Sequence, residues 1–70
     1  MAEIGARLKE ARERNKWTQI QVAEWTGIDA MTLSHYESGR REPGPANLAK
    51  LAKGLRVTSD YLLGIEAAAG

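Results

Sequence analysis

The stretch that most constrains the fold is residues 18–37, TQIQVAEWTGIDAMTLSHYE. Thr18 predicts the start of a helix, because its hydroxyl can accept a hydrogen bond from the free amides of the first turn. Gln21, three residues later, can reach back to the Thr18 amide and complete a capping box. Trp17 and Val22 have the spacing of a hydrophobic staple across the same boundary. Three independent signals therefore predict that a helix begins here.

A second helix follows after a very short turn. The helix that begins after Thr18, over residues 19–25, is expected to end at Gly27, which can adopt the left-handed conformation that closes a helix. Asp29 is then suited to cap a helix over residues 30–37. So short a connection forces the two helices to cross at a steep angle, in a helix-turn-helix arrangement. The second helix of such a pair can enter the major groove of DNA with its first turn against the bases.

The ordered set of residues in this region resembles the lambda-repressor-like (Cro/cI-type) helix-turn-helix domain. The matching positions are Thr18, Gln19, Val22, Ala23, Gly27, Leu33, Tyr36, Glu37, Gly39, Arg40, Arg41 and Pro43. The similarity continues through VTSDYLL at residues 57–63 and covers about residues 4–64. It implies an all-α, compact five-helix domain over residues 1–65, with the helix-turn-helix motif at about residues 18–37. Residues 66–70 are expected to form a frayed tail.

Apolar residues at helical spacing predict further helices on both sides of the motif. The first covers residues 3–15 and has a charged, solvated outer face. Pro45 is suited to the first position of a later helix, and Arg56 follows that helix where the family commonly has glycine. Because a left-handed arginine is strained, we expect the helix to end differently; Thr58 then caps a short helix over residues 59–63. The expected apolar surface comprises Ile4, Leu8, Ala11, Ile20, Val22, Ala23, Leu48, Leu51, Ala52, Leu55, Tyr61, Leu62 and Leu63.

Composition restricts the classes of partner. The chain has 70 residues and no cysteine, which excludes disulfides and thiolate metal sites. Its apolar runs are too short to span a membrane and no signal peptide is visible, so we expect a cytoplasmic location. The net charge is only +1 and the pI about 8.1, below the value of about 9 that marks a strongly basic nucleic-acid-binding domain. DNA binding therefore depends on where the charges lie after folding.

The resemblance implies which residues meet DNA. The expected base-facing residues are Ala30, Met31, Ser34 and His35, and the expected phosphate contacts are Gln19, Thr32, Ser38, Arg40 and Arg41. Met31 and Ala30 can contact a thymine methyl group, and His35 can bond to a purine edge. This helix lacks an arginine or glutamine for bidentate base readout, unlike well-known members of the family. DNA shape is therefore expected to carry part of the recognition.

Three further features are expected to position the domain or contact a partner. The resemblance pairs Arg12, in the helix over residues 3–15, with Glu37, at the end of the helix over residues 30–37. This contact would set the direction of the helix over residues 30–37, which is expected to read DNA. Trp25 stands where the family usually has a polar residue, and Thr26 where it has a larger apolar one. Trp25 is thus expected to be partly exposed, either resting on the core edge or contacting a partner protein or the DNA backbone. Ile65 and the last helix are expected to support a weak homodimer that DNA assembles.

These predictions describe a double-stranded-DNA-binding transcriptional regulator, a repressor that binds a two-fold operator as a dimer. The alternative is an antitoxin or adaptor whose main ligand is another protein, which the low net charge and Trp25 favour. No enzyme is expected, because His35 lacks a nucleophile or an orienting partner. No metal or other cofactor is expected either, since His35 has no second histidine or cysteine as a co-ligand.

Overall fold

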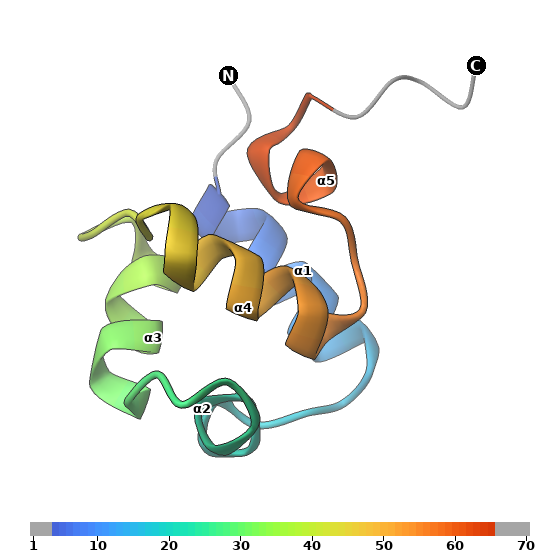
Figure 1. The fold of residues 1–70 in the computed structure, drawn as a ribbon. Helices are drawn as coiled ribbons and strands as arrows, with labels where there is room; N and C mark the ends of the chain where they lie inside the picture. Colours follow the sequence, from blue (N-terminus) through green and yellow to red (C-terminus); the bar gives the residue numbers. More distant parts are fainter. Residues whose placement is uncertain (1–3, 66–70) are drawn as a thin grey trace.

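The computed structural model describes residues 4–65, which form five helices and no strand (Figure 1). The helices are α1 (Ile4–Arg14), α2 (Gln19–Thr26), α3 (Ala30–Ser38), α4 (Pro45–Leu55) and α5 (Ser59–Leu63). The predicted all-α, five-helix fold is therefore confirmed for this part of the chain. The tail predicted over residues 66–70 lies outside the described residues. Across residues 4–65, every helix is too short or too polar to cross a membrane.

The boundaries of α2 and α3 are built by the predicted caps. The Thr18 hydroxyl accepts from the Gln21 amide at 3.0 Å, and the Gln21 side chain accepts from the Thr18 amide at 2.8 Å. Gly27 follows α2 with a φ of +77°. The Asp29 carboxylate accepts from the Thr32 amide at 3.1 Å and caps α3. Local chemistry thus determines both ends of the turn and the sharp change of direction between the helices.

The end of α4 differs from its prediction, because Arg56 does adopt the left-handed conformation, with a φ of +59°. Its amide donates to the carbonyl of Lys53 at 3.3 Å, and the Val57 amide donates to the carbonyl of Ala52 at 3.0 Å. Val57 also packs against the core. These bonds and this contact offset the roughly 1–2 kcal/mol cost of a left-handed arginine. A non-glycine residue therefore ends α4.

The core lies between the five helices and is almost entirely aliphatic. Its buried members are Leu8, Ala11, Val22, Ile28, Leu33, Tyr36, Leu51, Ala52, Leu55 and Leu62. Two residues of the predicted apolar surface are exposed: Ile20, at 63%, and Leu63, at 37%, which was expected to close the core. Ile20 lies on the outer side of the first turn of α2. The short α5 buries Leu62 completely, while the adjacent Leu63 points elsewhere because successive helical residues are turned by about 100°.

Thr26 is a buried polar residue at the close approach of α2 and α4. Its hydroxyl donates to the carbonyl of Val22 at 2.7 Å, and the Ile28 amide donates to that hydroxyl at 3.3 Å. The polar group is therefore satisfied inside the core. Opposite it, a Cβ added to Gly54 would lie only 2.9 Å from the Thr26 methyl carbon. A small residue on α4 thus lets the two helices meet at this point.

Candidate functional site

Helix α3 has one buried side and one accessible side. Leu33 and Tyr36 are buried and attach the helix to the core. On the other side Met31 is 70% exposed, while Ala30, Ser34 and His35 are half-buried. Figure 1 shows α3 at the edge of the fold, with α2 lying across its N-terminal end. The accessible side of α3 therefore offers apolar, hydroxyl and imidazole groups on one firmly held helix.

The carboxylate of Glu37 joins three helices. Arg12 of α1 donates from Nε to Oε2 at 2.7 Å and from Nη2 to Oε1 at 2.9 Å. Gln19 of α2 donates from Nε2 to Oε1 at 3.1 Å. The remaining Arg12 nitrogen, Nη1, donates to the carbonyl of Trp17 at 2.9 Å. The resemblance implied the first of these contacts, whereas the contact with Gln19 was not foreseen.

This cluster is largely removed from water. The side chains of Arg12 and Glu37 are only 12% and 5% exposed. The hydrogen bonding of Arg12 to the Glu37 carboxylate raises the pKa of Arg12 above its ordinary value, while burial opposes that shift. Removing one side chain of a buried ion pair is costly, because the charge that remains loses its main partner. The geometry thus holds the end of α3 at a set angle to α1 and α2, and an effect of this on ligand binding remains a prediction.

Gly5 allows α1 to approach the end of α3, a role that was not predicted from the sequence. A Cβ at this position would lie 2.3 Å from the carbonyl oxygen of Tyr36 and 2.7 Å from that of Glu37. No side chain fits at such distances without moving the backbone of α3. The available signal was an isolated glycine within an apolar helical pattern, which often marks close packing. Gly5 therefore belongs to the structure that positions Glu37.

Three predicted phosphate contacts already have hydrogen-bond partners inside the domain. One amide hydrogen of Gln19 points to Glu37, which leaves the second for a ligand. The Thr32 hydroxyl donates to Asp29 Oδ1 at 2.7 Å. The Ser38 hydroxyl donates to the carbonyl of its neighbour one turn back at 3.1 Å. Both hydroxyls would have to exchange these bonds in order to donate to a phosphate.

Arg40 and Arg41 are exposed in the loop that follows α3. Gly39 ends the helix with a φ of +83°. The amides of both arginines donate to the carbonyl of His35, at 2.9 and 3.2 Å. Among residues 4–65 neither guanidinium forms an ion pair. The loop therefore presents two exposed guanidinium groups, followed directly by the exposed Glu42, from a backbone that is hydrogen-bonded to the end of α3.

Trp25 and Ile65, the predicted partner contacts, are both exposed. Trp25 is 52% exposed and Ile65 is 66% exposed. The Trp25 ring meets that of Trp17 edge to face, with centroids 4.8 Å apart, and Trp17 in turn packs against the core. Trp25 thus rests on the edge of the core and still has half of its surface free. Both interpretations made from the sequence are compatible with this position.

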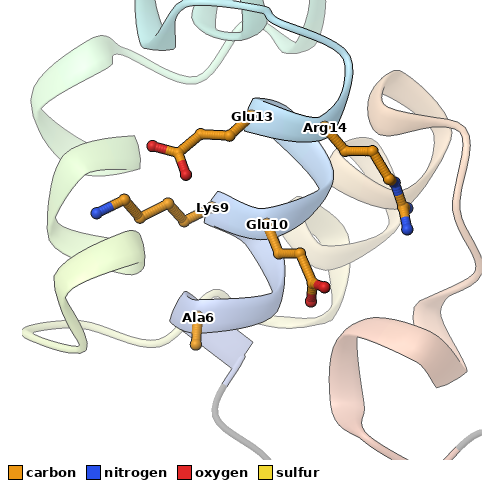
Figure 2. Close-up of a pocket in the computed structure, with 5 residues that line it drawn as sticks. All are labelled: Ala6, Lys9, Glu10, Glu13 and Arg14. Carbon is orange, nitrogen blue, oxygen red and sulfur yellow. The ribbon is translucent and has the colours of Figure 1, made fainter.

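The outer face of α1 forms a shallow hollow of charged side chains, shown in Figure 2. Its lining residues are Ala6, Lys9, Glu10, Glu13 and Arg14. Figure 2 shows Lys9 and Glu13 pointing to one side, and Glu10 and Arg14 to the other. No group of His, Cys, Asp or Glu that could hold a metal ion occurs within residues 4–65. On one side of this surface Glu10 accepts a hydrogen bond from the Tyr61 hydroxyl at 3.0 Å and Arg14 lies over the Tyr61 ring. The charged side chains thus diverge and do not form a convergent site.

Comparison with known proteins identifies the fold family. Residues 8–62 match the Helix-turn-helix family. The chain is 44% identical over 61 residues to the HTH-type transcriptional regulator ImmR of Bacillus subtilis (strain 168), covering 87% of this chain and 48% of ImmR. It is 36% identical over 64 residues to the HTH-type transcriptional repressor RghR of the same organism, covering 90% of this chain and 47% of RghR. The chain thus spans about half the length of these curated relatives.

A solved structure agrees with the sequence matches. The P22 c2 repressor protein, crystallised in complex with a synthetic operator, superposes with a TM-score of 0.87 and 29% sequence identity. The superposition covers 94% of this chain and 100% of that chain. The predicted resemblance to lambda-repressor-like domains is therefore confirmed. On its sequence, its helices and its turn geometry, the chain belongs to the helix-turn-helix family.

Proposed function

We propose that this domain binds double-stranded DNA by placing α3 in the major groove, and that it acts in transcription as a repressor. The observation that carries the proposal is the fixed position of α3. Its inner side is buried and its end is held by the Arg12–Glu37–Gln19 cluster, while its opposite side is free. Helices presented in this way read base edges with their first turns. The operator complex of the P22 c2 repressor and the repressor name of RghR support the proposal.

The residues on the free side divide into two proposed roles. Met31 and Ala30 would contact thymine methyl groups, while Ser34 and His35 would bond to base edges. Gln19, Thr32 and Ser38, together with Arg40 and Arg41, would contact phosphates on either side of the groove. For Gln19 the bond to Glu37 fixes the amide plane, so that its second hydrogen is already oriented. The first turn of α2 adds free amides that favour an anion.

We further propose that two copies bind a two-fold operator. One α3 covers only a half-site, and half-sites of such operators lie about 34 Å apart. The exposed Leu63 and Ile65 at the end of the described chain supply a small apolar patch. A patch of this size supports a weak dimer that assembles on DNA. Sedimentation without DNA should show a monomer at micromolar concentration, and a dimer that persists at nanomolar concentration would contradict this proposal.

Salt dependence tests the DNA-binding proposal. Fluorescence anisotropy with a labelled duplex should give an affinity that falls steeply as salt rises, with a slope of about −0.9 for each phosphate contact. Removing two contacts with Arg40→Ala and Arg41→Ala should weaken binding and make the slope shallower by roughly 1.8 per protomer. Arg14→Ala, which removes an exposed charge from α1, is the matched control and should leave the slope unchanged. Equal slopes for the loop variant and wild type would contradict the phosphate contacts.

A second function, as an antitoxin or adaptor that binds another protein, is favoured by one observation. Trp25 is half exposed although it stacks on Trp17, and exposed tryptophans often anchor protein contacts. The two functions can coexist on different surfaces. In either case the domain would work as a binding module rather than as an enzyme. A bacterial or phage regulator of this kind acts in the cytoplasm, where the DNA lies.

A further inference from the structure

A hollow of about 480 Å³ lies between the last turn of α2, the connection that precedes α2, and the end of α4. It is lined by Trp17, Trp25, Lys53, Gly54 and Arg56. We call this surface the tryptophan hollow. Gly54, where α4 meets Thr26 of α2, contributes backbone to the lining. Apolar surface and positive charge therefore meet in one depression.

The charges of the tryptophan hollow are available to a ligand. Lys53 and Arg56 are both exposed. Neither forms an ion pair with any carboxylate in the described part of the chain. The half-exposed ring of Trp25 stands edge to face against Trp17 and offers a large apolar surface. A ligand that complements this surface combines carboxylates with an aromatic or aliphatic group.

The tryptophan hollow lies away from the loop that carries Arg40 and Arg41. Helix α4 has 11 residues, so its ends are about 16 Å apart. The loop with Arg40 and Arg41 leads into the first end, and the tryptophan hollow lies at the other. Figure 1 shows α4 running from the α3 side of the fold toward the connection between α1 and α2. A ligand in the hollow can thus be held while α3 remains free.

We propose that the tryptophan hollow docks an acidic segment of a partner protein, in which a large apolar side chain stands between carboxylates. The apolar side chain covers the Trp25 ring, and the carboxylates pair with Lys53 and Arg56. A DNA backbone would satisfy the two cations but offers only the small hydrocarbon surface of its sugars to cover the indoles. A segment that fills so small a hollow buries little surface, so we expect a dissociation constant on the order of 10–1000 µM.

The chain contains two tryptophans, and both line the hollow, so their indole signals report its occupancy directly. The probe is a short capped peptide of glutamates around one phenylalanine and one leucine, without DNA present. One control peptide has lysine in place of each glutamate, and another has serine in place of both apolar residues. The acidic apolar peptide should shift both indole N–H resonances and change the tryptophan fluorescence. Equal shifts from either control, or no shift from the probe, would overturn the proposal.

Two variants locate the binding. Lys53→Glu should lower the affinity for the probe peptide about fivefold, because it replaces an attraction with a repulsion at an exposed site. Lys9→Glu makes the same charge change on α1 and should leave probe affinity unchanged. Trp25→Ala should abolish binding, and circular dichroism would verify its fold. If Trp25→Ala fails to fold, the comparison of Lys53→Glu with Lys9→Glu still decides, and equal affinities in these two variants would overturn the proposal.

Two other occupants of the hollow, DNA and a second copy of this chain, are distinguished with the same variants and the same resonances. If Lys53→Glu weakens duplex binding as much as the Arg40→Ala, Arg41→Ala variant does, the hollow belongs to the DNA-binding side and the proposal is wrong. If the indole resonances move with protein concentration alone, a second copy of this chain occupies the hollow, which also overturns it. Retained duplex affinity and concentration-independent resonances are the expected results. The peptide titration uses no DNA, so its failure is distinct from a failure of the DNA-binding proposal.

Discussion

Glu37 accepts hydrogen bonds from Arg12 of α1 and Gln19 of α2 while belonging to α3. Its side chain is only 5% exposed. We propose that Glu37 affects DNA binding without touching DNA, by setting the direction of α3. The sequence contained the two charged partners of this cluster, but their contact spans 25 positions and required the fold to bring them together.

Breaking this cluster from one side should be strongly destabilising. We expect Arg12→Ala and Glu37→Ala each to lower the free energy of unfolding by about 3 kcal/mol, since each removes the main partner of a largely buried charge. The double variant should lose at least about 1 kcal/mol less than the sum of the two single losses. Urea unfolding of the four proteins measures this coupling. Strictly additive losses would show that the contact does not hold the helices together.

Gly5 should tolerate no side chain. Gly5→Ala would place a Cβ 2.3 Å from the carbonyl oxygen of Tyr36, so α1 and α3 would have to separate. We expect a loss of at least about 2 kcal/mol in stability, despite the better helix propensity of alanine. Gly44→Ala is the control, because a Cβ there meets no atom within 4 Å and the change costs only the poorer N-cap propensity of alanine. Thermal unfolding compares them, and similar midpoints for both variants would contradict the close-contact explanation.

Asp29 should make stability depend on pH at the acid end. The hydrogen bond from the Thr32 hydroxyl, and then that from the Thr32 amide, lowers the pKa of Asp29. Its folded pKa is therefore below the unfolded value of about 3.9. The ionised carboxylate stabilises the fold fully above about pH 4, and this contribution is lost as the pH falls through the folded pKa.

Asp29→Asn tests this contribution, because asparagine is also a good N-cap but does not titrate. The other carboxylates titrate in both proteins, so the difference between the two stability curves isolates Asp29. We expect wild type to lose more free energy of unfolding than the variant between about pH 5 and about pH 2.5. Parallel curves, measured by urea unfolding at each pH, would assign the acid sensitivity to other groups.

At the scale of the helices, what could be predicted depended on how local the cause is. Caps act within one turn, so the start of α2 at Gln19 and the whole of α5 were predicted to the residue. Arg56 was missed because a backbone bond and the packing of Val57 outweigh its intrinsic preference. Gly5 was missed because its neighbours belong to α3. Periodicity identifies the side of a helix that is buried, but it does not identify the atoms that meet there.

The crossing of α2 and α3 supplies a test at this scale. Ala23 is buried on α2, and the short turn after that helix leaves little room for a larger residue. Ala23→Leu should lower the free energy of unfolding by roughly 1–3 kcal/mol through overpacking. Ile20→Leu, on the exposed outer side of the same helix, is the control and should change little. An unchanged melting temperature for Ala23→Leu would show that the crossing has spare volume.

For the binding of partners by the whole molecule, the positions of the charges on the fold matter more than the net charge. A net charge of +1 produces little long-range attraction for DNA, so the proposed interface relies on Arg40 and Arg41 and on helix N-termini next to α3. The tryptophan hollow concentrates other cations at the far end of α4. The fold therefore presents two separate positively charged regions, for which we propose different partners. Their separation could not be predicted from the sequence, because it depends on how α4 crosses the molecule.

The central claim is that α3 reads double-stranded DNA, and selection of bound duplexes from a random pool at moderate salt tests it most directly. The account predicts enrichment of an inverted repeat with half-sites about one helical turn apart. In the same selection, Met31→Ala should change the preferred bases at particular positions, whereas the Arg40→Ala, Arg41→Ala variant should lower recovery with the motif unchanged. No enrichment by a protein that is folded by circular dichroism would contradict the account.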